Sequence, residues 1–191
     1  MKRIVLALAL TGLTACASKP TDSAAKAPDD RTPQGLASPS PEAAVYSAAI
    51  RQLILVDHGY GKARPPYKVV YVLNGPVPGA ENSNKLVSEI KPATTFSPEM
   101  QRQIVNALPD LPPVLFVPDR EAVITGEAPG HVINDGVLVA LGPVRWEGSA
   151  KATIGSNRWA NGLNGQWVTY VLDYSKPEWR IAGTTGTTAI S

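Results

Sequence analysis

The sequence predicts an α+β fold, in which two helices pack on a mostly antiparallel sheet that ends in a C-terminal β-meander. Three features indicate this class. Apolar residues recur at helical spacing after two similar helix-start signals, and runs of β-branched and aromatic residues crowd the last third of the chain. The 18 prolines and 16 glycines among 191 residues favour turns and strands over a helical bundle.

Two helices are expected, at 41–57 and 98–108. Each follows the same signal, Ser40-Pro41-Glu42 or Ser97-Pro98-Glu99, which supplies a serine N-cap, a proline at the first helical position and an acid in the first turn. Apolar side chains at helical spacing continue both segments: Tyr46, Ala49, Ile50, Leu53 and Ile54, then Met100, Ile104 and Leu108. The predicted helix ends are marked by Gly59, Gly61, Pro109 and the Pro112-Pro113 pair.

Short runs rich in β-branched and aromatic residues predict the strands. These runs lie at 67–73, 114–117, 137–144, 150–154, 166–172 and 178–182. The last four follow one another across short turns, so we expect them to pair as an antiparallel meander. Asn164-Gly165 is typical of a hairpin turn between two of them. The Gly- and Thr-rich segment 183–188 is expected to form an edge strand or a terminal loop.

The N-terminus is organised like an export signal. Met1-Lys2-Arg3 is positively charged, and residues 4–10 form an apolar run much shorter than the roughly 20 residues that span a bilayer. Leu13-Thr14-Ala15-Cys16 resembles the lipobox of bacterial lipoproteins. The resemblance implies that the Cys16 thiol receives a diacylglyceryl group, that a peptidase cuts before Cys16, and that the freed amine is acylated, as with palmitate. The alternative is an ordinary small-x-small cut around Cys16, which would give a soluble secreted protein.

Three segments follow from this interpretation: a lipoprotein signal peptide at 1–15, a lipidated cysteine and flexible tether at 16–40, and a single α+β domain at 41–191. The tether has almost no large apolar residue, so it cannot bury enough surface to fold. Its mean reach as a flexible coil is about 25–30 Å. In Gram-negative lipoproteins, an Asp directly after the lipidated cysteine resembles a signal for retention in the inner membrane, and Ala does not. Ala17 therefore favours the outer membrane, facing the periplasm, over the inner cell membrane.

Charge and composition limit the partners. The formal net charge is +2, and Lys2 and Arg3 supply all of it, so basic and acidic residues balance in the rest of the chain. Without a basic cluster, nucleic acid is not an expected partner. The expected partners are a membrane, through the lipid on Cys16, and an envelope protein or a wall component. No cofactor and no metal are expected.

Two histidines are the candidate catalytic or metal-binding groups. His58 stands beside Asp57, although an ordinary helix end with Gly59 as a left-handed cap accounts for the same residues. His131 lies in a predicted loop. The chain has no His-x-x-x-His spacing and no Gly-x-Ser-x-Gly motif. We therefore expect a non-enzymatic binding module, and the alternative is an envelope hydrolase or metal-dependent enzyme that uses His58 or His131.

Trp159 and Arg158 are the candidate interaction residues. Segment 158–165 is predicted to be a loop, and an exposed tryptophan beside an arginine is typical of interaction hot spots. In the alternative, Trp159 folds back onto the sheet, as tryptophans in strands usually do. Segments 167–170 and 179–183 are similar to the Trp-containing strand pair that ends some uncharacterised bacterial envelope domains. That resemblance covers the last third of the chain and implies no activity.

Overall fold

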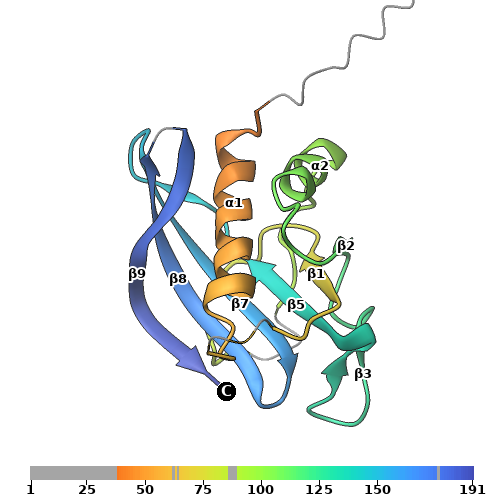
Figure 1. The fold of residues 1–191 in the computed structure, drawn as a ribbon. Helices are drawn as coiled ribbons and strands as arrows, with labels where there is room; N and C mark the ends of the chain where they lie inside the picture. Colours follow the sequence, from red (N-terminus) through yellow and green to blue (C-terminus); the bar gives the residue numbers. More distant parts are fainter. Residues whose placement is uncertain (1–37, 62, 64, 86–89, 176) are drawn as a thin grey trace, which may run out of the picture. The chain divides into compact units, whose positions relative to one another are not determined.

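The computed structural model describes residues 38–61, 63, 65–85, 90–175 and 177–191 (Figure 1). The predicted signal peptide, the predicted lipidation site at Cys16 and nearly all of the predicted tether lie outside the described residues. In the described part of the chain, no helix is long and apolar enough to cross a membrane.

Both helices begin where the sequence predicts. α1 (Pro41–Arg51) and α2 (Pro98–Asn106) each follow a serine N-cap, Ser40 and Ser97, whose hydroxyl oxygen accepts a backbone N–H of the first turn. α1 continues into a π-helical segment, η1 (Gln52–Val56), so helical structure ends just before the predicted 57. α2 ends at 106 rather than at the predicted 108. The predicted helix starts are therefore correct, and the predicted ends differ slightly.

The described residues form one nine-stranded sheet, and the predicted α+β class is confirmed. Its strands are β1 (Val69–Leu73), β2 (Val114–Val117), β3 (Ile124–Thr125), β4 (His131–Val132), β5 (Gly136–Leu141), β6 (Arg145–Trp146), β7 (Lys151–Asn161), β8 (Asn164–Ser175) and β9 (Glu178–Ile190). β1 pairs in parallel with β2 on one side and β5 on the other, and the remaining pairs are antiparallel. α2 lies between β1 and β2 in the chain and provides the crossover that parallel strands need. A short 3₁₀ helix, η3 (Ile133–Asp135), precedes β5.

The predicted C-terminal meander is present as β7, β8 and β9, but its strands are longer than expected. The predicted loop at 158–165 is wrong, because β7 continues to Asn161. Asn161 pairs with Asn164, so the hairpin turn lies at 162–163 and not at Asn164-Gly165. β9 runs on to Ile190 at the edge of the sheet, so segment 183–188 is an edge strand and not a terminal loop.

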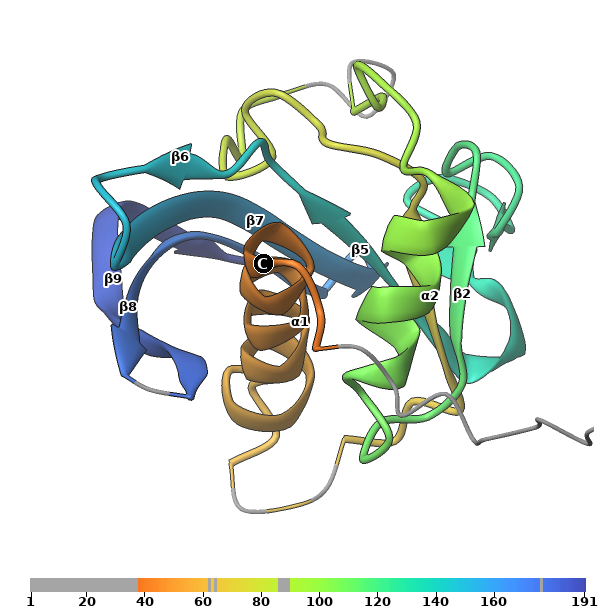
Figure 2. The same cartoon turned by 90° about the horizontal axis from the view of Figure 1, so that it is seen from above.

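The two helices lie on one face of the sheet, and β7, β8 and β9 curve around α1 (Figure 2). The main hydrophobic core fills the space between these layers and includes Tyr46 and Ile50 of α1, Val72 of β1 and Tyr170 of β8. A smaller apolar cluster covers the opposite face of β1 and β5. Every residue of β1 and β5 is buried, which explains why both strands are continuous apolar runs.

Candidate functional site

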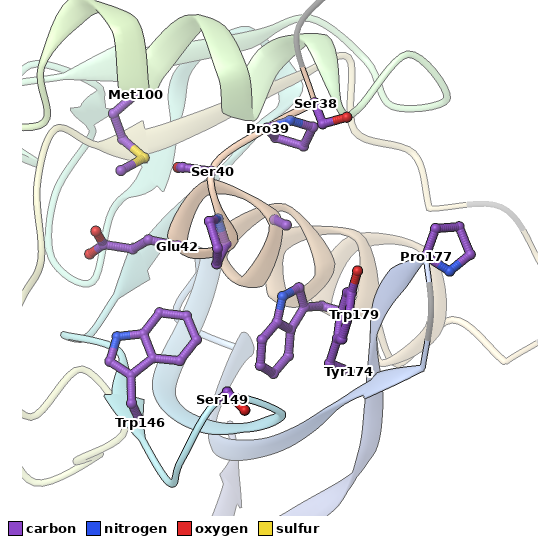
Figure 3. Close-up of a pocket in the computed structure, with 12 residues that line it drawn as sticks. Ser38, Pro39, Ser40, Glu42, Met100, Trp146, Ser149, Tyr174, Pro177 and Trp179 are labelled. Carbon is purple, nitrogen blue, oxygen red and sulfur yellow. The ribbon is translucent and has the colours of Figure 1, made fainter.

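Three aromatic side chains form a row beside the start of α1 (Figure 3). Trp146 comes from β6, Tyr174 from β8 and Trp179 from β9. The Trp179 ring lies in the middle, with its centroid 5.5 Å from that of Trp146 and 5.4 Å from that of Tyr174. Trp179 is 9% exposed, whereas Trp146 is 45% and Tyr174 37% exposed. The row therefore has a buried centre and two open ends.

Strand pairing brings these rings together. Tyr174 and Trp179 are direct partners across the β8–β9 hairpin, so their side chains stand on the same face of the sheet. Trp146 reaches the row from the other side of β7, where β6 pairs with it opposite Ala152. All three residues lie close to a chain reversal, so their rings stand at the rim of the sheet.

An open pocket of about 950 Å³ separates the aromatic row from the start of α1 (Figure 3). Residues 38–41, Glu42 and Ala44 form the wall opposite the rings, and Met100 of α2 also lines the pocket. We call this space the aromatic pocket. Ligand sites in proteins typically have volumes of about 300–1,000 Å³ and a mostly apolar lining with few polar groups. The aromatic pocket has both properties.

The polar groups of the aromatic pocket include two that can only donate hydrogen bonds, the indole N–H groups of Trp146 and Trp179. The hydroxyls of Tyr174, Ser38, Ser40 and Ser149 can donate or accept. Glu42 is the only charged side chain among the described residues that line the pocket. Its Oε1 accepts a hydrogen bond from the Tyr46 hydroxyl at 3.3 Å. Burial, together with the negative charge of Glu42, raises the pKa of Tyr46.

The sequence-predicted Asp57–His58 pair lies elsewhere, just after η1. The Asp57 carboxylate accepts a hydrogen bond from the Tyr170 hydroxyl at 2.7 Å and another from Gln52 Nε2 at 3.2 Å. The His58 side chain is buried, and its Nδ1 accepts the Tyr60 backbone N–H at 3.0 Å. Burial and the hydrogen bond to Asp57 raise the pKa of Tyr170. The carboxylate and the imidazole therefore have separate partners and do not form a catalytic pair.

Arg158 lies in the interior, where it holds this region together. It is 2% exposed, and its Nε and Nη2 donate to the Asp57 carbonyl oxygen at 3.3 and 3.2 Å. Its Nη1 donates to the Tyr67 hydroxyl at 3.1 Å and to Asn164 Oδ1 at 2.6 Å. Trp159 points to the opposite face of β7, where it packs half-buried on the smaller apolar cluster with the Arg120 guanidinium 5.3 Å from its ring centroid. Neither side chain occupies the exposed loop that the sequence predicts.

His131 is not brought to the other candidate residues. It is exposed on the two-residue strand β4, which pairs with β3 and with the end of β7. Across the described ranges, no group of three His, Cys, Asp or Glu side chains could hold a metal ion. Within the same ranges, neither histidine hydrogen-bonds to a serine or a carboxylate. The hydrolase and metal hypotheses therefore gain no geometric support from these residues.

Sequence reasoning missed the aromatic pocket. The sequence pattern does not single out Trp146, Tyr174 or Trp179 as binding residues. The available signal is that each aromatic residue stands next to a predicted turn, where a strand reaches the rim of the sheet. A sequence does not show which rims meet in space, because β6 and the β8–β9 hairpin approach each other only through β7.

No protein-family model, no curated protein and no solved structure matches this chain.

Proposed function

We propose that this chain is a lipid-anchored cell-envelope protein whose folded domain binds a partner in the aromatic pocket and catalyses no reaction. The aromatic row is the observation that carries the proposal. Tryptophan and tyrosine dominate the binding energy of many interfaces because each buries a large area with little loss of side-chain entropy. An exposed apolar patch rimmed by polar groups is also a common mark of a binding site.

The exposure of the rings indicates how much binding energy the pocket can supply. Covering the open part of Trp146 or Tyr174 would contribute about 2 kcal/mol for each ring. The surrounding serine, glutamate and indole groups can then orient a partner through a few hydrogen bonds. The two rings would thus form the energetic centre of a larger contact surface.

The position of the aromatic pocket in the chain supports the envelope setting. Residues 38–41 line it, and residues 38–40 are the end of the predicted tether that starts at Cys16. A partner in the pocket would therefore be held at the end of the domain to which the lipid anchor connects. With the lipobox, this favours an envelope protein or a wall component as the partner.

Cross-linking in living cells tests the proposal. The tagged full-length chain would be recovered with its cross-linked partner and compared with a Trp146→Ala variant, for which we expect recovery to fall about tenfold. Leu163→Ala is the matched control, because Leu163 is 89% exposed at the β7–β8 hairpin and lies outside the pocket. Equal recovery by wild type and Trp146→Ala would contradict the proposed binding site.

A further inference from the structure

We infer that the aromatic pocket accepts an extended, proline-containing peptide segment of a partner protein, with a basic side chain of that segment placed near Glu42. This inference rests on the proposed function, because it names the chemical class of the partner. Four properties of the described residues support it: the tilt of the rings, the donors along them, the extended wall opposite them and the sign of the charge.

The rings form a stepped surface and not a flat one. The planes of Trp146 and Trp179 make an angle of 67°, and those of Tyr174 and Trp179 an angle of 43°. Proline-rich peptides bind in grooves between aromatic side chains. The tilted rings provide such a groove for a proline side chain.

The hydrogen-bond donors of the aromatic row match the free acceptors of a proline-rich peptide. A polyproline II helix has no internal hydrogen bonds, so all of its carbonyl oxygens are free to accept. The aromatic row provides the indole N–H groups of Trp146 and Trp179, which can only donate, and the Tyr174 hydroxyl. At a rise of about 3.1 Å per residue, about four residues of such a peptide would cover the row.

The opposite wall of the pocket is itself an extended proline segment. Ser38-Pro39-Ser40-Pro41 lines the pocket, and Ser40 has φ −56° and ψ 152°, close to polyproline II values. A second extended segment would lie between this wall and the rings.

The negative charge of Glu42 favours a partner with a positive charge at this position. Glu42 Oε1 is bound by Tyr46, and Oε2 has no hydrogen-bond donor among the described residues. No described lining residue is positively charged, and a lysine or arginine of the peptide could pair with the Glu42 carboxylate. Proximity to aromatic faces further favours a cation.

Peptide titration of the purified full-length chain, followed by tryptophan fluorescence and calorimetry, tests the inference. The probe is an acetylated peptide of alternating proline and alanine with one lysine. We expect it to bind, and we expect about tenfold weaker binding when its prolines are replaced by alanine or when the chain carries Trp146→Ala. Leu163→Ala should bind like wild type. Glu42→Gln should weaken binding of the lysine peptide several-fold but not of the same peptide with glutamine in place of lysine.

The other outcomes separate the two proposals. If a soluble glycan fragment of the cell wall binds in a Trp146-dependent manner and the proline peptide does not, the peptide inference is wrong and the proposed function stands. If neither probe binds and the cross-linked partner does not depend on Trp146, both fail. If replacing Pro20, Pro28 and Pro33 by alanine in the full-length chain strengthens peptide binding about tenfold, the chain's own tether is the occupant, which overturns the assignment to a partner protein.

Discussion

Arg158 is a charged residue whose contacts all lie within the domain. Its guanidinium connects the end of η1, through the Asp57 carbonyl, with Tyr67 and with Asn164 at the start of β8. A buried cation is tolerated only when its N–H groups donate to acceptors. The three nitrogens of this guanidinium donate four hydrogen bonds to three acceptors. The side chain thus joins segments that are distant in the sequence.

Replacing Arg158 by lysine should destabilise the domain. An ammonium group cannot reach all three acceptors that the planar guanidinium binds, so at least one would stay buried without a donor. We expect Arg158→Lys to lower the free energy of unfolding by about 2–4 kcal/mol, measured by urea denaturation. Arg180→Lys is the control, because Arg180 forms an exposed ion pair with Glu178 and should change stability by less than about 0.5 kcal/mol. Unchanged stability of Arg158→Lys would contradict this role.

Tyr46 and Tyr170 should make the domain sensitive to alkaline pH. Burial raises the pKa of both phenols in the folded state, and the acids Glu42 and Asp57 raise them further. In the unfolded state they would ionise near pH 10, so the unfolded chain binds fewer protons than the folded one above that pH. Their contribution to stability is therefore complete below about pH 10 and is lost as the pH rises, by at most about 1.4 kcal/mol per pH unit for each group.

Urea titrations at pH 9 and pH 11 measure this effect. Tyr170→Phe should be less stable than wild type at pH 9, because Asp57 loses a hydrogen-bond donor, and should lose less further stability at pH 11. Leu163→Ala provides the control, because it removes no ionisable group from an exposed position and should retain the pH dependence of wild type. An identical pH dependence for wild type and Tyr170→Phe would refute the assignment.

The region after α1 shows what local sequence reveals and what it does not. Gly59 has φ +80°, and the sequence identifies it correctly as the left-handed residue after the helix. The partners of Asp57 were not predictable from local pattern, since Tyr170 and Arg158 reach it from strands about a hundred residues later. The same holds for the aromatic row, where only the folded sheet brings Trp146 to Trp179.

For the elements, the most reliable sequence signal was the repeated Ser-Pro-Glu start. Ala43 N–H donates to Ser40 Oγ at 3.2 Å, and Met100 N–H donates to Ser97 Oγ at 3.1 Å. These caps satisfy backbone donors that the helix itself leaves free. They are local interactions, which is why both starts could be predicted.

Removing the cap of α2 should therefore cost a measurable part of the stability. We expect Ser97→Ala to lower the free energy of unfolding by about 1 kcal/mol and Ser97→Asp to restore most of it, since aspartate caps equally well and favours the positive end of the helix dipole. Ser83→Ala, at an exposed turn position, should have no effect beyond about 0.5 kcal/mol. If Ser97→Asp were as unstable as Ser97→Ala, the cap would not explain the loss.

The strands of the meander were harder to delimit than the helices. β7 contains Ser156, Asn157 and Arg158 in succession, which breaks the apolar alternation that marks a strand. In the structure, Asn157 donates to the Ala80 carbonyl oxygen on one face, and Arg158 is bound on the other. These partners come from distant segments, so the polar residues resemble a loop in the sequence although they lie in a buried strand.

For the molecule as a whole, attachment to a membrane is the property to test first. We expect the wild-type chain to incorporate labelled palmitate and to enter the detergent phase in a detergent-partition experiment, because several acyl chains give stable anchoring. Cys16→Ser should do neither. Cys16 is the only cysteine in the chain, so the variant alters no other thiol. Equal partition of wild type and Cys16→Ser would exclude the lipid anchor.

The aromatic pocket is partly built from residues 38–41, the stretch that joins the domain to the predicted tether. With the lipid anchor proposed at Cys16, the membrane would pull on the domain through residue 38, and a bound partner would pull on Trp146, Tyr174 and Trp179. Both forces would act at the same end of the domain, because these rings and residues 38–41 line one pocket. The tension would then cross the pocket and enter β6, β8 and β9 only near the strand ends that carry the rings.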